Sequence, residues 1–241
     1  YLVFDEFHLF EPTSTLPTTL AMLKMLRGFA PFLLMTATFS GEMLRGLAQE
    51  LDAVVVPEDT AARAAMHAIP SQDKTRIYHV VRSPLTADAV IGHHHGQGHQ
   101  RTLVVCNVVD RARRLFRELR AHPDLGETQV RLLHSRFLRK HRQEIEGTVR
   151  EQFKRGNREG SWIVVATQVV EVGLDMTADA LHTELAPANA VIQRAGRCAR
   201  YEGEVGHVFV YTLALDDRGE VIALTESAWP YQDERAVIER T

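Results

Sequence analysis

The run Thr102-Leu103-Val104-Val105-Cys106 decides the fold class, because Asn107 follows it and an amphipathic segment over residues 110–121 comes next. Such a run predicts a buried strand, and the segment after it repeats apolar residues with helical spacing. A strand that leads into a helix is the building unit of parallel α/β sheets. The polar residue between them is expected at the carboxyl edge of the sheet, where α/β proteins bind ligands.

The same order of elements recurs along the chain. Further apolar runs lie at residues 1–4, 32–35, 130–133, 163–166 and 207–211, and a second helical segment covers residues 139–155. All but the last of the six runs end in polar residues: Asp5-Glu6, Thr36-Ala37-Thr38, Asn107, His134-Ser135-Arg136 and Thr167-Gln168. One polar residue after a strand is usually a turn or a helix cap, but the repeated pattern favours a ligand-binding edge.

Two α/β domains are expected. Residues 57–74 are polar and rich in alanine, and Pro70-Ser71-Gln72-Asp73 punctuates them, which predicts a boundary. We therefore expect part of a first domain over residues 1–74, a second domain over 75–214, and a linker with the start of an accessory region over 215–241. Because the chain opens on a strand and stops within a helical pattern, we expect it to be a fragment.

Composition narrows the class of protein. The chain has 241 residues, of which 45% are hydrophobic and 24% charged, as in ordinary globular proteins. Its net charge of -3 means that any nucleic-acid binding must use local basic patches. Cys106 and Cys198 lack metal-ligand spacing, and no signal peptide or long apolar span is visible. A cytoplasmic protein without a membrane partner is expected.

Carboxylates and hydroxyls follow the first two strands. Asp5 and Glu6 suit metal-assisted phosphoryl transfer, in which Asp5 holds Mg²⁺ through water and Glu6 polarises the attacking water. His8 is expected to link this site to the neighbouring Thr36-Ala37-Thr38. The simpler alternatives are an acidic loop for the first pair, and for Thr36 and Thr38 the cap of a helix that begins near residue 40.

A second motif lies near the end of the chain, at Gln193-Arg194-Ala195-Gly196-Arg197-Cys198-Ala199-Arg200. Two arginines three residues apart are predicted on one face of a helix, where they can stabilise a phosphoryl group in transfer. A solvated basic helix face is the alternative. A separate cluster, His93-His94-His95 with His99, can in principle bind zinc or nickel, but a solvated glycine-rich loop over residues 92–98 is the favoured interpretation.

Taken together, these motifs resemble the core of superfamily 2 helicases, and more narrowly the CRISPR-associated Cas3 family. Asp5-Glu6-Phe7-His8, Thr36-Ala37-Thr38 and residues 193–200 match the superfamily's motifs II, III and VI. The narrower match rests on Leu103-Val104-Val105-Cys106-Asn107-Val108-Val109-Asp110-Arg111-Ala112, on Leu133-His134-Ser135-Arg136-Phe137 with Arg142, and on Ala166-Thr167-Gln168-Val169-Val170-Glu171-Val172-Gly173-Leu174-Asp175. The resemblance spans nearly the whole chain and implies tandem RecA-like parallel-sheet domains, the first incomplete.

The resemblance also implies an activity, cofactors and site residues. It implies an ATP- and Mg²⁺-dependent translocase on single-stranded DNA, recruited by a CRISPR surveillance complex of the Cascade type. The catalytic residues implied are Asp5, also the metal ligand, with Glu6, His8, Gln193, Arg197 and Arg200. The nucleotide-binding residues implied are Thr36, Thr38, Gly173, Asp175 and Gly196. The nucleic-acid-binding residues implied are Asn107, His134, Ser135, Arg136, Thr167, Gln168 and Glu171.

The sequence departs from the family pattern at three points, which leave alternatives open. It contains no Gly-x-x-x-x-Gly-Lys-Ser/Thr phosphate loop and no HD nuclease, which in this family is fused or separate. Val172-Gly173 replaces the Gln-Ser of the best-known members, which indicates a divergent branch or a stand-alone subunit. The alternatives are another DExH RNA or DNA-repair helicase, or a module that binds nucleic acid or protein without hydrolysis.

Overall fold

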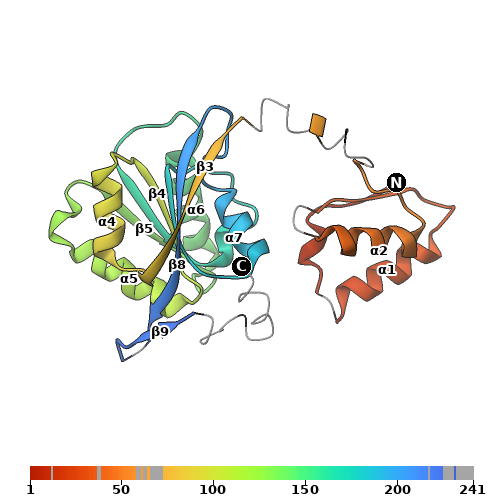
Figure 1. Ribbon diagram of the computed structural model, residues 1–241, viewed down its shortest axis with the longest axis horizontal. Coiled ribbons are helices and arrows are strands. Elements are labelled where there is room, and N and C mark those ends of the chain that lie inside the picture. The colour runs from red at the N-terminus through yellow and green to blue at the C-terminus, as the bar shows by residue number, and fades with distance from the viewer. Residues whose placement is uncertain are drawn as a thin grey trace. The chain divides into compact units, whose positions relative to one another are not determined.

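The computed structural model describes residues 1–11, 13–36, 39–57, 61, 64–65, 73–216, 218–224 and 231 (Figure 1). The chain divides into two compact units, residues 1–68 and residues 69–241. Each unit contains helices and a sheet of parallel strands. The predicted α/β class with parallel sheets is confirmed.

The first unit is small. Its elements are β1 (Leu2–Phe4), the short 3-10 helix η1 (Phe7–Leu9), α1 (Thr15–Met25), β2 (Phe32–Leu34) and α2 (Gly41–Leu51). The two strands are parallel, with Val3 opposite Leu33. The polar residues that follow β1 and those that follow β2 therefore lie at the same edge of this sheet, as the sequence predicted.

The second unit is built on a larger sheet. Its strands are β3 (Thr75–Pro84), β4 (Arg101–Val105), β5 (Gln129–Leu133), β6 (Trp162–Ala166), β7 (Ala180–Glu184), β8 (Val205–Leu215) and β9 (Val221–Ala223). The order is β3-β8-β7-β4-β6-β5, all parallel, while β9 pairs antiparallel with β8. The helices are α4 (Ala87–Gly96), α5 (Val109–Ala121), α6 (Arg139–Gln152) and α7 (Ala188–Ala195), with short 3-10 helices η3 (Pro123–Leu125) and η4 (Gln168–Val170).

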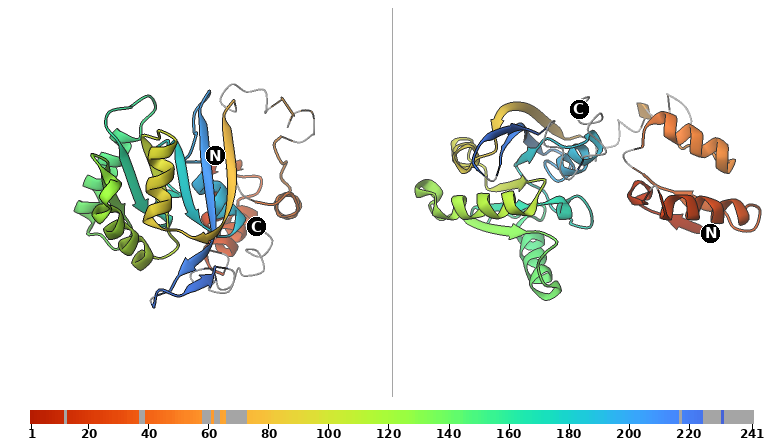
Figure 2. Two further views of the ribbon diagram at one scale, coloured as in Figure 1. Left: turned by 60° about the vertical axis from the view of Figure 1, so that its left-hand side comes forward. Right: turned by 90° about the horizontal axis from the view of Figure 1, so that it is seen from below.

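Helices cover both faces of this sheet, which explains why Leu103, Val104 and Val105 of β4 are apolar in succession. Leu103 and Val105 of β4 pack into a cluster with residues of α6 and α7, whereas Val104 packs with residues of α4 and α5. Successive side chains of a strand point to opposite faces, so a strand between two helical layers favours apolar residues at successive positions. The two layers can be followed in Figure 2.

The sequence prediction missed β7, although this strand lies at the centre of the sheet. Its residues His182, Thr183 and Glu184 are each 2% exposed or less, and their polarity hid the strand from a search for apolar runs. Each polar side chain has a partner inside the protein. His182 Nδ1 lies 2.9 Å from the hydroxyl of Tyr211, and Glu184 pairs with Arg111.

The prediction of a solvated loop over residues 92–98 is wrong. Helix α4 continues to Gly96, and His94 is fully buried, with its ring nitrogens 2.7 Å from the hydroxyl of Thr102 and 2.6 Å from that of Ser161. Burial lowers the pKa of His94 to about 4, so the ring is neutral at physiological pH. No group of three or more metal-binding side chains occurs within the described ranges. Those ranges also hold no helix long and apolar enough to cross a membrane.

Candidate functional site

The Asp5-Glu6-Phe7-His8 stretch turns away directly after β1 and is anchored by its phenylalanine. Phe7 is 1% exposed, and its ring contacts three further phenylalanine rings. Its backbone N–H donates to the carbonyl oxygen of Met35 at 2.9 Å, which ties the turn to the end of β2. Asp5 is exposed and the Glu6 side chain is 45% exposed, so both carboxylates remain accessible.

His8 connects this turn to the polar segment after β2. Its Nε2 lies 3.5 Å from a carboxylate oxygen of Glu6, and its Nδ1 lies 3.3 Å from the hydroxyl of Thr36. The cap of α2 is Ser40, whose hydroxyl accepts a backbone hydrogen bond at 3.1 Å, so Thr36 does not cap that helix. Thr38 lies outside the described residues.

Four neighbouring strands of the second unit end in polar side chains at one edge of the sheet. Asn107, His134 and Thr167 follow β4, β5 and β6, and Glu184 ends β7. All four residues are 6% exposed or less. The predicted row of polar groups is therefore largely an internal network, which must satisfy its own hydrogen bonds.

Arg194 of α7 is the centre of this network, and the sequence analysis assigned it no role. It is fully buried and donates to a carboxylate oxygen of Glu171 at 2.8 Å. It also donates to Asn107 Oδ1, Thr183 Oγ1, the Glu184 carbonyl and the Tyr231 hydroxyl at 3.0, 2.9, 3.1 and 2.8 Å. A guanidinium carries five N–H donors, which suits it to joining several elements at one point. The number of carboxylate and hydroxyl groups near the strand ends could have indicated such a partner.

Most of the residues predicted to bind nucleic acid here are engaged within the protein. The side-chain amide of Asn107 donates to the backbone carbonyl of Leu185 at 2.8 Å. The backbone carbonyl of Asn107 accepts from the side-chain amide of Gln168 at 2.7 Å. Thr167 is 2% exposed. Burial raises the pKa of Glu171, although the positive charge of Arg194 acts in the opposite direction. Asn107 is thus bonded directly to Gln168 and, through Arg194, to Glu171.

The exposed part of this edge lies after β5. Ser135 and Arg136 are exposed, and Arg136 lies 3.8 Å from a carboxylate oxygen of Asp110. His134 is buried beneath Phe137, and their rings stack with centroids 4.2 Å apart. This stacking fixes the course of the segment and leaves Ser135 and Arg136 accessible to a ligand.

The prediction that Arg197 and Arg200 share a helix face is wrong, because α7 ends at Ala195. Beyond the helix, Ala178 donates its backbone N–H to the carbonyl of Arg197 at 2.9 Å and accepts from Ala199 at 3.0 Å. Ala199 also adopts a positive φ of 42°, which is incompatible with a continued helix. Pairing with residue 178 therefore overrides the helical tendency of the segment.

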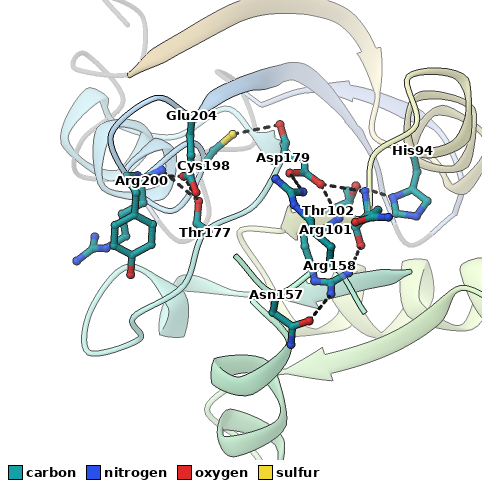
Figure 3. Close-up of polar contacts among 12 residues, drawn as sticks. His94, Arg101, Thr102, Asn157, Arg158, Thr177, Asp179, Cys198, Arg200 and Glu204 are labelled. Atoms are coloured by element: carbon teal, nitrogen blue, oxygen red, sulfur yellow. Dashed lines mark hydrogen bonds and ion pairs between the residues drawn. The ribbon is translucent and has the colours of Figure 1, made fainter. Parts of the chain in front are cut away.

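The segment after α7 nevertheless brings both arginines onto residues 170–175. Arg197 donates to the carbonyl oxygens of Val170 at 2.9 Å and Glu171 at 2.5 Å. Arg200 forms an ion pair with Asp175 at 2.9 Å. The backbone N–H of Arg200 donates to the hydroxyl of Thr177, which in turn donates to Glu204 at 2.6 Å (Figure 3).

The two glycines predicted to bind nucleotide stand where larger residues fit poorly. A Cβ at Gly196 would lie 3.0 Å from the carbonyl oxygen of Gln193, the half-buried residue three positions earlier. Gly173 has a φ of +75°, and its carbonyl accepts from Arg150 at 3.1 Å. The structure therefore brings Gln193, Gly196, Arg197, Arg200 and Asp175 into one region, together with the exposed backbone of Gly173.

Comparison with known proteins gives concordant matches. Residues 98–203 match the family model described as CRISPR-associated nuclease/helicase Cas3, C-terminal. A curated relative from Myxococcus xanthus, a putative CRISPR-associated nuclease/helicase Cas3, is 33% identical over 207 residues, which is 83% of this chain. The chain spans only 25% of that relative's length.

Solved structures share the fold of the chain. The crystal structure of T. fusca Cas3 with ATP matches 99% of this chain and 32% of its own, with a TM-score of 0.74 and 22% identity. A structure described as a CRISPR RNA-guided surveillance complex, pre-nicking, matches 99% of this chain and 34% of its own, with a TM-score of 0.73 and 21% identity. With the family model, the curated relatives and the motifs in agreement, the chain belongs to the family of CRISPR-associated Cas3 helicases.

Proposed function

We propose that this chain forms part of an ATP-dependent motor that moves along single-stranded DNA and acts with a CRISPR surveillance complex. Membership of a family of nucleases and helicases supports the proposal. The T. fusca relative with ATP supports a nucleotide ligand, and the surveillance-complex structure supports the class of partner. DNA rather than RNA is proposed because the Cas3-specific stretches, including Leu133-His134-Ser135-Arg136-Phe137, are present.

The observation that carries the proposal is the set of contacts between residues 170–175 and the two arginines. Arg197 holds the backbone of Val170 and Glu171, and the partly exposed Arg200 is paired with Asp175. A carboxylate holds a guanidinium much as a phosphate does, with charge-assisted hydrogen bonds. We propose that the γ-phosphate of ATP displaces Asp175 and binds Arg200.

The buried network offers a route from nucleotide to nucleic acid. Arg197 contacts the backbone of Glu171, and the Glu171 side chain contacts Arg194. Arg194 contacts Asn107, which is bonded to Gln168 at the end of β6. Each step is a direct hydrogen bond between groups with little freedom, so a shift at Arg197 is proposed to move the carboxyl edge of the sheet.

Within the first unit, Asp5 is proposed to hold the metal and Glu6 to orient the attacking water. Asp5 offers accessible carboxylate oxygens, the ligand type that Mg²⁺ prefers, and Mg²⁺ usually completes its coordination with water and substrate phosphates. Bound Mg²⁺ would neutralise negative charge on the phosphates. Glu6 would orient the attacking water, and His8, between Glu6 and Thr36, would couple that carboxylate to the segment after β2.

The decisive experiment measures ATP hydrolysis by the complete product of the gene that encodes this chain. Rates are compared without nucleic acid, with single-stranded DNA and with single-stranded RNA, for the wild type, Arg200→Ala and Arg218→Ala. Arg218 is exposed in the turn between β8 and β9 and serves as the control. We expect stimulation by DNA, a loss of about a thousand-fold in kcat for Arg200→Ala, and no change for Arg218→Ala.

The other outcomes distinguish the alternatives. Stronger stimulation by RNA would favour a general DExH helicase. Binding of nucleic acid without hydrolysis under any condition would favour the non-catalytic module. Full activity of Arg200→Ala would exclude the assigned role of this arginine even if the protein proved to be an ATPase.

A further inference from the structure

A groove of about 880 Å³ runs beside β5, an edge strand of the described sheet. Helix α5 lines it along one side, and the segment after β5 lines one end. Its described lining residues include four arginines and no carboxylate: Arg113, Arg120, Arg131 and Arg136. In a chain whose net charge is -3, this is a marked local concentration of positive charge.

Few internal partners neutralise these arginines. Within the described ranges, one carboxylate lies within ion-pair distance of their guanidinium groups. It belongs to Asp110, which is 3.7 Å from Arg113 and 3.8 Å from Arg136, and which is itself mostly exposed. Exposed pairs at such distances contribute little free energy, so a polyanion can replace them at small cost.

The buried His134 reports the same positive field. Burial lowers the pKa of this residue, and the charges of Arg113 and Arg136 lower it further. The side chain of Asp110 acts in the opposite direction but more weakly. The groove therefore disfavours an added positive charge even where a carboxylate is near.

Aromatic and apolar side chains accompany the arginines. Phe116 of α5 and Phe137 after β5 both line the groove, and both are half-buried. The ring of Phe137 is held against His134, and the guanidinium of Arg120 lies 5.7 Å from the centre of the Phe116 ring. Cationic groups beside fixed aromatic rings are the combination with which proteins bind single strands without reading their sequence.

The position of the groove connects it to the exposed residues at the end of β5. Arg136 lines the groove, and its neighbour Ser135 is exposed at the carboxyl edge of the sheet. A nucleic-acid strand bound at these residues can therefore continue beside β5 without leaving the positively charged surface. Arg113 and Arg120 lie seven residues apart on α5, two helical turns, and so lie on the same side of the helix.

We propose that this groove, through Arg113, Arg120 and Arg131, is a further binding site for the phosphodiester backbone of a single-stranded nucleic acid. The inference rests on the proposed function, because it assumes that the protein binds a single-stranded nucleic acid. The arginines bind phosphates and the phenylalanines contact bases, so the site is expected to bind without sequence preference. The charge complementarity favours a polyanion of this kind over an uncharged partner.

The test uses the complete gene product and fluorescence anisotropy with a labelled oligothymidylate over a series of salt concentrations. The variant Arg113→Gln with Arg120→Gln removes two charges from the groove and keeps residues that favour a helix. The control, Arg82→Gln with Arg218→Gln, removes two exposed charges from β3 and from the turn before β9. Thermal unfolding of all three proteins shows whether the fold is kept.

We expect the groove variant to bind the oligonucleotide more weakly and to lose about 1.4 from the slope of log K against log salt, roughly 0.7 for each phosphate contact. The control should match the wild type. A wild-type protein that binds no DNA would refute the proposed function itself. Wild-type binding with an unchanged slope in the groove variant would refute only this inference. The inference would also be overturned if the groove variant lost binding to polyglutamate while its DNA binding was unchanged. An acidic polypeptide would then be the ligand of the groove.

Discussion

Replacement of Arg194 with methionine tests whether the buried network holds the second unit together. Methionine has a similar length but carries neither charge nor donors, so Glu171 loses its ion-pair partner inside the protein. Breaking a buried pair by removing one member costs about 3–5 kcal/mol. For a chain of this size each kcal/mol lowers the Tm by about 2–4 °C, which gives a fall of roughly 6–20 °C.

The assay is urea denaturation followed by circular dichroism, with Glu171→Met and the double variant as the other members of a cycle. The double variant removes both charges, so we expect it to be less destabilised than the sum of the single variants, by about 0.5–3 kcal/mol. A loss below about 1 kcal/mol for Arg194→Met, the value of an exposed ion pair, would refute the reasoning.

The same variant has a defined pH dependence. Burial raises the pKa of Glu171 and Arg194 counteracts this effect, so removing Arg194 should raise that pKa further. A carboxyl whose pKa is higher in the folded than in the unfolded state stabilises the fold at low pH, and this stabilisation is lost as the pH rises. The destabilisation by Arg194→Met should therefore shrink as the pH is lowered from neutrality toward the range in which Glu171 titrates.

Two further predictions concern packing and protonation. Gly206→Ala places a Cβ 2.5 Å from the sulfur of Cys198, so we expect the free energy of unfolding to fall by about 1–3 kcal/mol, measured by thermal unfolding. Gly147→Ala in α6, whose Cβ meets nothing within 4 Å, should raise the free energy of unfolding by about 0.5–1 kcal/mol. If Gly206→Ala were no more destabilising than Gly147→Ala, the close packing of Cys198 would be contradicted. The pKa of His94 is about 4 in the folded state and about 6.5 in the unfolded state. The contribution of neutral His94 to stability is therefore complete above about pH 6.5 and is lost as the pH falls toward about 4. Unfolding free energies measured between these pH values should vary less for His94→Asn than for the wild type, and equal dependence would contradict the burial of the neutral ring.

The sequence was sufficient to predict β4, β5, β6 and β8 of the large sheet but not the polar strand β7. A strand between two helical layers is typically a continuous apolar run, as in residues 103–105 of β4 and throughout β6. In β7 this rule fails, because Glu184 is paired with Arg111, and Thr183 accepts a hydrogen bond from Arg194. Such partners lie many residues away, or on a different element, and no local pattern reveals them.

The candidate site was predictable in composition but not in geometry. The residue types at the strand ends indicated a ligand-binding edge, yet the backbone at residues 197–199 is set by pairing with Ala178 rather than by helix propensity. The prediction of a loop around His94 was wrong for a related reason, because Thr102 and Ser161 provide hydrogen-bond partners for the ring nitrogens of His94 in the core. In both cases a tertiary contact overrides local preference, as propensity arguments allow.

The three arginines of the motif at residues 193–200 have different tasks. Arg194 is fully buried and bonds to four segments of the chain, one of them at Glu171, while Arg197 binds the backbone carbonyls of Val170 and Glu171, so both hold residues 170–171 in place. The Arg200 side chain, by contrast, is 37% exposed and is paired with an exposed carboxylate. A phosphate can compete for an exposed pair but not for a buried one, because leaving Glu171 buried without its partner is too costly. We therefore propose Arg200 as the arginine that a nucleotide contacts, and we expect the loss of Arg194 to abolish activity through the fold rather than through the chemistry.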